Sequence, residues 1–174
     1  MGTTAVSATT IAAANAAAID AREFRDALGS FATGVTIVTT RDAAGHDVGL
    51  TANSFNSVSL DPPLVLWSLA KSSKSLSAFV EAKHFAVHIL AADQEPLSNR
   101  FATRGADKFA GLQWRAGSNG AAIIDGVLGY VECKIAQCHD GGDHTIVVGE
   151  IVNVNAIGER PLLFFKGKYQ RLPN

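Results

Sequence analysis

The most informative segment of the chain reads VLGYVECKIAQCHDGGDHTIVVGEIVNV and covers residues 127–154. Within residues 131–135 apolar and charged side chains alternate, which is the two-residue period of a half-buried β-strand. Gly141 and Gly142 then mark a turn, and the extended pattern returns from His144 to Val154. The segment therefore predicts two long antiparallel strands joined by a tight turn.

Much of the remaining chain consists of short β-branched or aromatic runs bounded by Gly, Pro and polar turn residues, which is typical of strands. The predicted strands are residues 34–40, 48–60, 64–69, 84–91, 162–165 and 169–172. The first two should form a β-hairpin, and the last two are split by Gly167. Pro62 and Pro63 precede the strand at 64–69.

Only three short helices are predicted. They begin at Asp20, after the serines at 72, 73 and 75, and at Asp93, and they end near Gly29, Glu81 and Arg104. Residues 105–125 are rich in Gly and Ala without a sustained period, which predicts a loop. These strands, with few β–α–β crossovers between them, predict a mainly β fold with short helices (α+β), arranged as an antiparallel barrel of six or seven strands.

Composition excludes several classes of partner. The formal net charge is −1 and the 18% of charged residues are spread along the chain, so no footprint for nucleic acid or membrane is expected. No apolar run reaches the roughly 20 residues that cross a bilayer. Residues 1–19 are Ala- and Thr-rich and lack the basic start of a secretion signal, which predicts a disordered or loosely helical tail before one domain at residues 20–174.

The two cysteines, Cys133 and Cys138, lie five residues apart on opposite faces of the expected strand, so a disulfide between them is geometrically poor. Unpaired thiols are typical of a reducing compartment, which predicts a cytoplasmic protein. No metal site is predicted. The sequence also lacks a Rossmann glycine pattern, a P-loop and a nucleophile elbow.

Short polar side chains recur in residues 49–63, GLTANSFNSVSLDPP, within a run that otherwise has strand character. These Thr, Ser and Asn side chains are suited to lining the polar edge of a ligand. Three pieces of the chain then match one family in order and spacing: FRDALGSFATGV at 24–35, LTANSFNSVS at 50–59 with the following Pro62-Pro63, and Gly142-Asp143-His144. Together they resemble the short-chain flavin reductase family over nearly all of residues 22 to 172.

The resemblance implies an FMN-binding split barrel of Greek-key type, commonly a homodimer. It also implies an enzyme that transfers a hydride from NADH or NADPH to FAD or FMN. The reduced flavin would then pass to a separate monooxygenase component, with aromatic-compound degradation as the expected context. In such an enzyme the flavin is the acceptor, so the protein supplies orientation and needs little acid–base chemistry of its own.

The resemblance implies a set of site residues as well. The flavin ring and ribityl chain would lie beside Thr51, Ala52, Asn53 and Ser54. The phosphate would lie beside Ser68, Leu69, Ala70, Lys71, Ser72, Ser73 and Ser75, with Lys74 as a second nearby cation. Arg100 and Phe101 would approach the flavin. Gly142, Asp143 and His144 would meet the nicotinamide cofactor, with His144 as the catalytic residue that holds the nicotinamide against the flavin.

Each assignment has a structural alternative. Residues 51–54 could be ordinary strand or turn residues, the serines could only cap a helix, Arg100 could lie on a helix surface, and His144 could be a turn histidine. Phe164, Phe165 and Tyr169 could pack against the flavin ring or belong to the core or a dimer interface. Two alternative functions also stay open: a non-enzymatic flavin-binding split-barrel protein, and an enzyme similar to pyridoxamine-phosphate oxidase.

Overall fold

A computed structural model describes residues 19–105, 107–156, 158 and 160–173. The predicted N-terminal tail, residues 1–19, lies outside the described residues except for Ile19. Among the described helices none combines the length and apolar character needed to span a bilayer.

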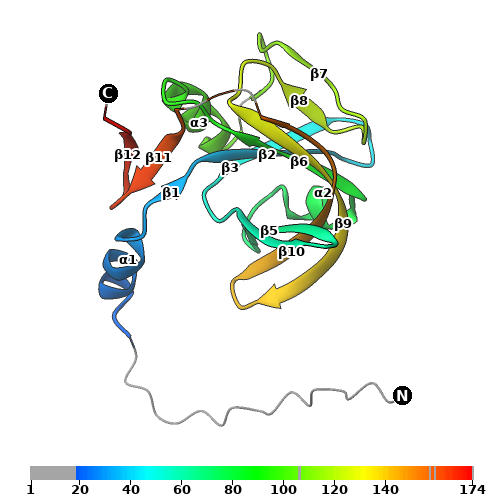
Figure 1. The fold of residues 1–174 in the computed structure, drawn as a ribbon. Coiled ribbons are helices and arrows are strands. Elements are labelled where there is room, and N and C mark those ends of the chain that lie inside the picture. The colour runs from blue at the N-terminus through cyan, green and yellow to red at the C-terminus, as the bar shows by residue number, and fades with distance from the viewer. Residues whose placement is uncertain (1–18, 106, 157, 159, 174) are drawn as a thin grey trace, which may run out of the picture.

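The molecule is built around a seven-stranded antiparallel sheet in the order β3-β2-β6-β9-β10-β5-β4. Its strands are β2 (Thr36–Arg41), β3 (Asp47–Ala52), β4 (Asn56–Leu60), β5 (Pro63–Ala70), β6 (His84–Ile89), β9 (Gly129–Gly141) and β10 (His144–Ala156). β9 and β10 are the predicted pair of long strands, with His144 opposite Gly141. They curve along one side of the molecule, so that the sheet wraps around the core (Figure 1).

The core inside this sheet is aromatic and aliphatic. Trp67, Phe79 and Phe85 are fully buried, and the rings of Trp67 and Phe79 meet edge to face at 5.0 Å. A second cluster contains Ile37 and Leu90 together with Phe101, which is a buried residue of α3 (Glu95–Ala102). Burial of these large side chains is the main favourable contribution to folding.

The three predicted helices are present. α1 (Ala21–Gly29) is capped by Asp20, whose carboxylate accepts the Arg22 and Glu23 N–H groups at 2.9 and 3.0 Å. α2 (Leu76–Glu81) begins after Ser75, but no serine side chain caps it. α1 projects from the body of the molecule and has no buried residue (Figure 1).

Two smaller sheets complete the fold. β1 (Thr33–Gly34), β11 (Leu162–Phe165) and β12 (Lys168–Arg171) form one, and β7 (Trp114–Ala116) and β8 (Ala122–Ile124) form the other. The mainly β, antiparallel prediction is confirmed, with seven strands in the main sheet.

Two local predictions were wrong. Residues 105–125 are not all loop. They contain β8, which is completely buried against β2 and β6, and β7, which pairs with β8. Residues 48–60 are not one strand: the chain leaves β3 after Ala52 and re-enters the sheet as β4 beside β5. The turn between them is held by Ser54, whose hydroxyl accepts the Ser68 N–H at 2.9 Å.

Candidate functional site

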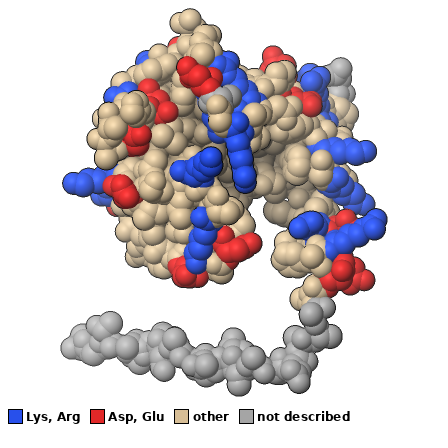
Figure 2. Space-filling view, turned by 180° about the vertical axis from the view of Figure 1, so that it is seen from behind, with Lys and Arg blue, Asp and Glu red and all other residues tan. Residues whose placement is uncertain are grey.

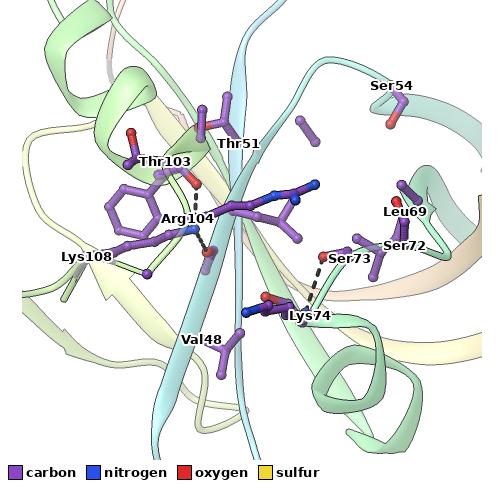
Figure 3. Close-up of a pocket in the computed structure, with 18 of the residues that line it drawn as sticks. Val48, Thr51, Ser54, Leu69, Ser72, Ser73, Lys74, Thr103, Arg104 and Lys108 are labelled. Carbon is purple, nitrogen blue, oxygen red and sulfur yellow. Dashed lines mark hydrogen bonds between the residues drawn. The ribbon is translucent and has the colours of Figure 1, made fainter.

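One cavity, of about 620 Å³, lies between β3, the end of β5 with the serines that follow it, and the segment after α3 (Figure 3). We call it the main cleft. Twelve residues of the predicted site line it: Thr51, Ala52, Asn53, Ser54, Ser68, Leu69, Ala70, Ser72, Ser73, Ser75, Phe101 and His144. Four others, Lys71, Arg100, Gly142 and Asp143, are not among its lining residues.

The β3 wall of the main cleft is fixed by hydroxyl groups. Thr51 Oγ1 donates to the Ser98 carbonyl at 2.6 Å, which ties β3 to α3. Ser54 Oγ accepts the Ser68 N–H and donates to the Ser68 carbonyl at 3.2 Å, which ties the end of β3 to β5. These two hydroxyls therefore hold the walls of the cleft together, and each oxygen retains capacity to accept a further hydrogen bond.

Lys71 turns away from the main cleft. Its Nζ lies 2.7 Å from Asp140 Oδ2 at the end of β9, and this hydrogen bond holds the pKa of Asp140 below its usual range. The next serines do face the cleft, and Ser73 Oγ accepts the Ser75 N–H at 3.2 Å. The structure therefore does not bring Lys71 together with these serines, because its backbone N–H and side chain are both engaged by the β9–β10 hairpin.

Arg100 does not line the main cleft either. Its guanidinium donates to the backbone carbonyls of Asp107 and Ala110, so it braces the segment after α3 from outside the cleft. The cleft instead receives Arg104, which extends across β3 toward the opposite wall, and Lys74 (Figure 3). Within the described part of the chain the side chains of Arg104 and Lys74 have no hydrogen-bond or ion-pair partner. Two cations are thus free to meet an anionic ligand.

The floor of the cleft is closely packed where α3 crosses β3. Lys108 Nζ donates to the carbonyls of Gly49 and Phe101 at 3.0 and 2.7 Å, and burial lowers the pKa of this ammonium group. The Phe101 ring lies directly over Gly49, where an added Cβ would come within 2.5 Å of it. Only glycine leaves room for this ring at position 49.

His144 closes one corner of the main cleft as the first residue of β10. Its Nδ1 lies 2.7 Å from Asp143 Oδ1, a contact that lowers the pKa of the Asp143 carboxyl. With the Nδ1 proton directed at Asp143, Nε2 is left as the other hydrogen-bonding atom of the ring. Gly142, with φ of +77°, and Asp143 form the turn that positions this imidazole.

Basic side chains surround this part of the surface. Figure 2 shows a hollow between the body of the molecule and the projecting helix α1, with Lys and Arg side chains along its sides. Basic side chains beside a concave surface attract anionic ligands.

The sequence matches the family model described as "Flavin reductase like domain" over residues 28–173. The antiparallel fold and the serine-lined cleft agree with this sequence match. The chain belongs to the flavin reductase-like family. That membership confirms the predicted enzyme class, a flavin reductase that takes electrons from a reduced nicotinamide cofactor.

Individual relatives agree with this class. The chain is 51% identical over 152 residues to FMN reductase (NADH) SmoA from Agrobacterium fabrum, covering 87% of this chain and 86% of SmoA. It is 44% identical over 155 residues to HsaB from Rhodococcus jostii, the reductase subunit of a flavin-dependent monooxygenase, covering 88% and 79% of the two chains.

Solved structures give the same result. Nitrilotriacetate monooxygenase component B from Mycobacterium thermoresistibile has a TM-score of 0.85 and 45% identity, covering 91% of this chain and 89% of its own. The NADH:FAD oxidoreductase SgcE6 of Streptomyces globisporus C-1027, solved with NAD and FAD fragments, has a TM-score of 0.84 and 37% identity, covering 88% and 93%.

Proposed function

We propose that the main cleft holds a flavin and NADH together, so that a hydride passes from the nicotinamide to the flavin ring. The observation that carries this proposal is the composition of the cleft. It combines a β3 wall of small and polar residues, a serine-lined end with the cations of Lys74 and Arg104, which have no partner among the described residues, and a histidine at one corner. Its volume of about 620 Å³ lies within the range of small-molecule sites.

A flavin fits the chemistry of these groups. The serine-lined end with Lys74 and Arg104 offers hydroxyl, backbone and cationic donors to a phosphate, and residues 51–54 offer short polar groups to the ring and ribityl chain. The bound flavin supplies the electron-accepting ring. The chain supplies orientation, and we assign His144 the task of holding the nicotinamide carboxamide or ribose through Nε2.

The reduced flavin then leaves for a separate monooxygenase component. Support comes from relatives whose names describe reductase subunits of flavin-dependent monooxygenases, including the trigonelline enzyme of Acinetobacter baylyi at 47% identity. We further propose that residues 20–174 act as one domain in the cytoplasm. The free thiols of Cys133 and Cys138 fit that compartment.

We also propose that the protein works as a homodimer. The amphipathic helix α1 leaves Phe24 and Leu28 51% and 59% exposed, and the neighbouring Phe31 is 75% exposed. An apolar helix face that the described part of its own chain leaves exposed is typical of a surface that a second subunit buries.

The test is anaerobic mixing of the protein with oxidised flavin and NADH while the flavin absorbance band is followed. The expected result is bleaching that depends on the enzyme and is repeated over many turnovers when excess flavin is present. A protein that retains flavin but never bleaches it with NADH or NADPH would support the non-enzymatic alternative and reject this proposal.

A further inference from the structure

A second, smaller cavity adjoins the main cleft at the end of β3. Its volume is about 130 Å³, and its lining residues are Val35, Thr51, Ala52, Asn53, Phe164 and Tyr169. Three of these, Thr51, Ala52 and Asn53, also line the main cleft. A ligand that lies along residues 51–53 therefore has access to both cavities, and we call the smaller one the aromatic pocket.

The aromatic walls of this pocket come from the C-terminal hairpin. The rings of Phe164 and Tyr169, on β11 and β12, meet edge to face at 5.5 Å with an angle of 70°. Both rings are partly buried against the cluster that contains Val35. Two rings packed in this way present an apolar aromatic surface to a flat aromatic ligand.

The Tyr169 ring is held in place by two side chains of α3. Its hydroxyl lies 2.8 Å from Ser98 Oγ and 3.3 Å from Asn99 Oδ1. The Ser98 carbonyl in turn accepts the Thr51 hydroxyl at 2.6 Å. One chain of hydrogen bonds therefore fixes the aromatic pocket relative to the β3 wall, so the pocket is formed before a ligand arrives.

Size and polarity limit what the aromatic pocket accepts. None of the described residues that line it is charged. A cavity of about 150 Å³ with apolar walls is known to hold benzene, so a space slightly smaller than that accepts about one six-membered ring and excludes a tricyclic system. The cations of the region, Lys74 and Arg104, line the main cleft instead.

We propose that the aromatic pocket receives the dimethylbenzene edge of the flavin, with Phe164 and Tyr169 as specificity-determining residues. The inference rests on the proposed function, because it requires a flavin in the main cleft. The polar pyrimidine edge and the ribityl phosphate then stay in the main cleft among its hydroxyl, backbone and cationic donors.

The test compares riboflavin with its analogue that lacks the two ring methyl groups, using dissociation constants from quenching of flavin fluorescence. The wild-type protein is expected to bind riboflavin about tenfold more tightly, because two buried methyl groups are lost in the analogue. In Phe164→Ala and Tyr169→Ala this ratio should fall to about two or less, since the methyl groups no longer meet a packed wall.

Phe165→Ala is the matched control, because Phe165 neighbours Phe164 on β11 but lines neither cavity. Its ratio should equal that of the wild type. If an alanine variant does not fold, Phe164→Leu keeps apolar bulk and should lower the ratio in the same direction. A wild-type ratio near one, or an equal ratio in all variants, would overturn the inference. A wild-type protein that neither binds nor reduces any flavin would instead reject the proposed function.

Discussion

Arg100 and Arg104 are four residues apart, yet only Arg104 enters the main cleft. The reason is that α3 ends at Ala102, so Arg104 leaves the helical direction while Arg100 stays on the helix and bonds the carbonyls of Asp107 and Ala110. Lys71 and Lys74 differ in the same way, because Lys71 is paired with Asp140. In each pair, the cation that already has a partner within the chain is the one that does not line the cleft.

Replacing either free cation should weaken binding of a phosphorylated flavin. We expect Arg104→Gln and Lys74→Gln each to raise the KM for FMN by about fivefold, since a charge-assisted contact to phosphate is lost at a partly solvated site. The KM for riboflavin, which has no phosphate, should stay unchanged. Steady-state kinetics with both flavins measure this, and Lys71→Gln is the control that should match the wild type. An equal increase in the KM for riboflavin would show that these two cations do not bind the flavin phosphate.

His144 should act on the nicotinamide cofactor. His144→Ala is expected to raise the KM for NADH by about tenfold, because one oriented hydrogen bond is lost, and to leave the KM for flavin almost unchanged. His139→Ala is the control, since His139 lies on the same hairpin, bonds Gln137 and does not line the cleft. The reverse pattern, with a larger effect on flavin, would separate His144 from the nicotinamide.

At the scale of elements, the sequence predicts those strands and helices that have a clear hydrophobic period or a clear boundary residue. Alternation in 131–135 and the glycines at 141 and 142 define β9 and β10, and Asp20 marks the start of α1. β8 is missed because Ala122–Ile124 is buried on both faces and shows no alternation. The break after Ala52 is missed because a hydrogen bond from a distant strand, Ser68 N–H to Ser54, produces it.

The same limit applies to the candidate site. Residues 51–54 and the serines are found because the motif places them on one strand and one turn. Arg104 and Lys108 carry no signal of their own, because their positions depend on how the segment after α3 folds back on β3.

The crossing of α3 over β3 gives a prediction about elements. Gly49→Ala should lower the unfolding free energy by about 1–3 kcal/mol, because the new methyl group overlaps the buried Phe101 ring and overpacks the crossing. Thermal unfolding measures the effect, and a lower catalytic rate should accompany it because Gly49 lines the cleft. Gly34→Ala is the matched control on β1, where an added Cβ meets nothing within 4 Å. Equal stability of the two variants would show that the crossing is loosely packed.

At the scale of the whole molecule, α1 is unusual because its apolar residues Phe24 and Leu28 remain exposed in a single subunit. Phe24→Glu combined with Leu28→Lys should convert the protein to a monomer, because charges replace the apolar face that a second subunit would bury. Light scattering coupled to size exclusion gives the mass directly. Arg22→Gln, on the same helix and 91% exposed, should keep the oligomeric state of the wild type. A wild-type protein that is monomeric at all concentrations would contradict the dimer.

The stability of the whole fold should also depend on pH through His88. This imidazole is completely buried, with Nδ1 3.0 Å from the Ile37 carbonyl and Nε2 accepting the Ile124 N–H, and burial lowers its pKa from 6.5 to about 4. Below pH 6.5 the His88 imidazole takes up a proton in the unfolded chain, whereas in the folded protein it is protonated only near pH 4. The stabilisation is therefore complete above pH 6.5, and about 3 kcal/mol of it is lost as pH falls to 4.

Urea unfolding at several pH values in this window tests the assignment. His88→Gln should be less stable than the wild type at pH above 6.5, and its unfolding free energy should fall less steeply toward pH 4, since the titrating group is gone. His139→Gln, at an exposed position, should keep the wild-type slope. An unchanged slope in His88→Gln would assign the pH dependence to other groups.

The most direct measurement is a crystal structure with oxidised flavin and NAD bound together. It should show the flavin ring along residues 51–54, its phosphate within hydrogen-bond distance of Ser73 and Arg104, and the nicotinamide between the ring and His144. Flavin bound elsewhere, with residues 51–54 in contact with no ligand, would show that the main cleft is not where the hydride is transferred.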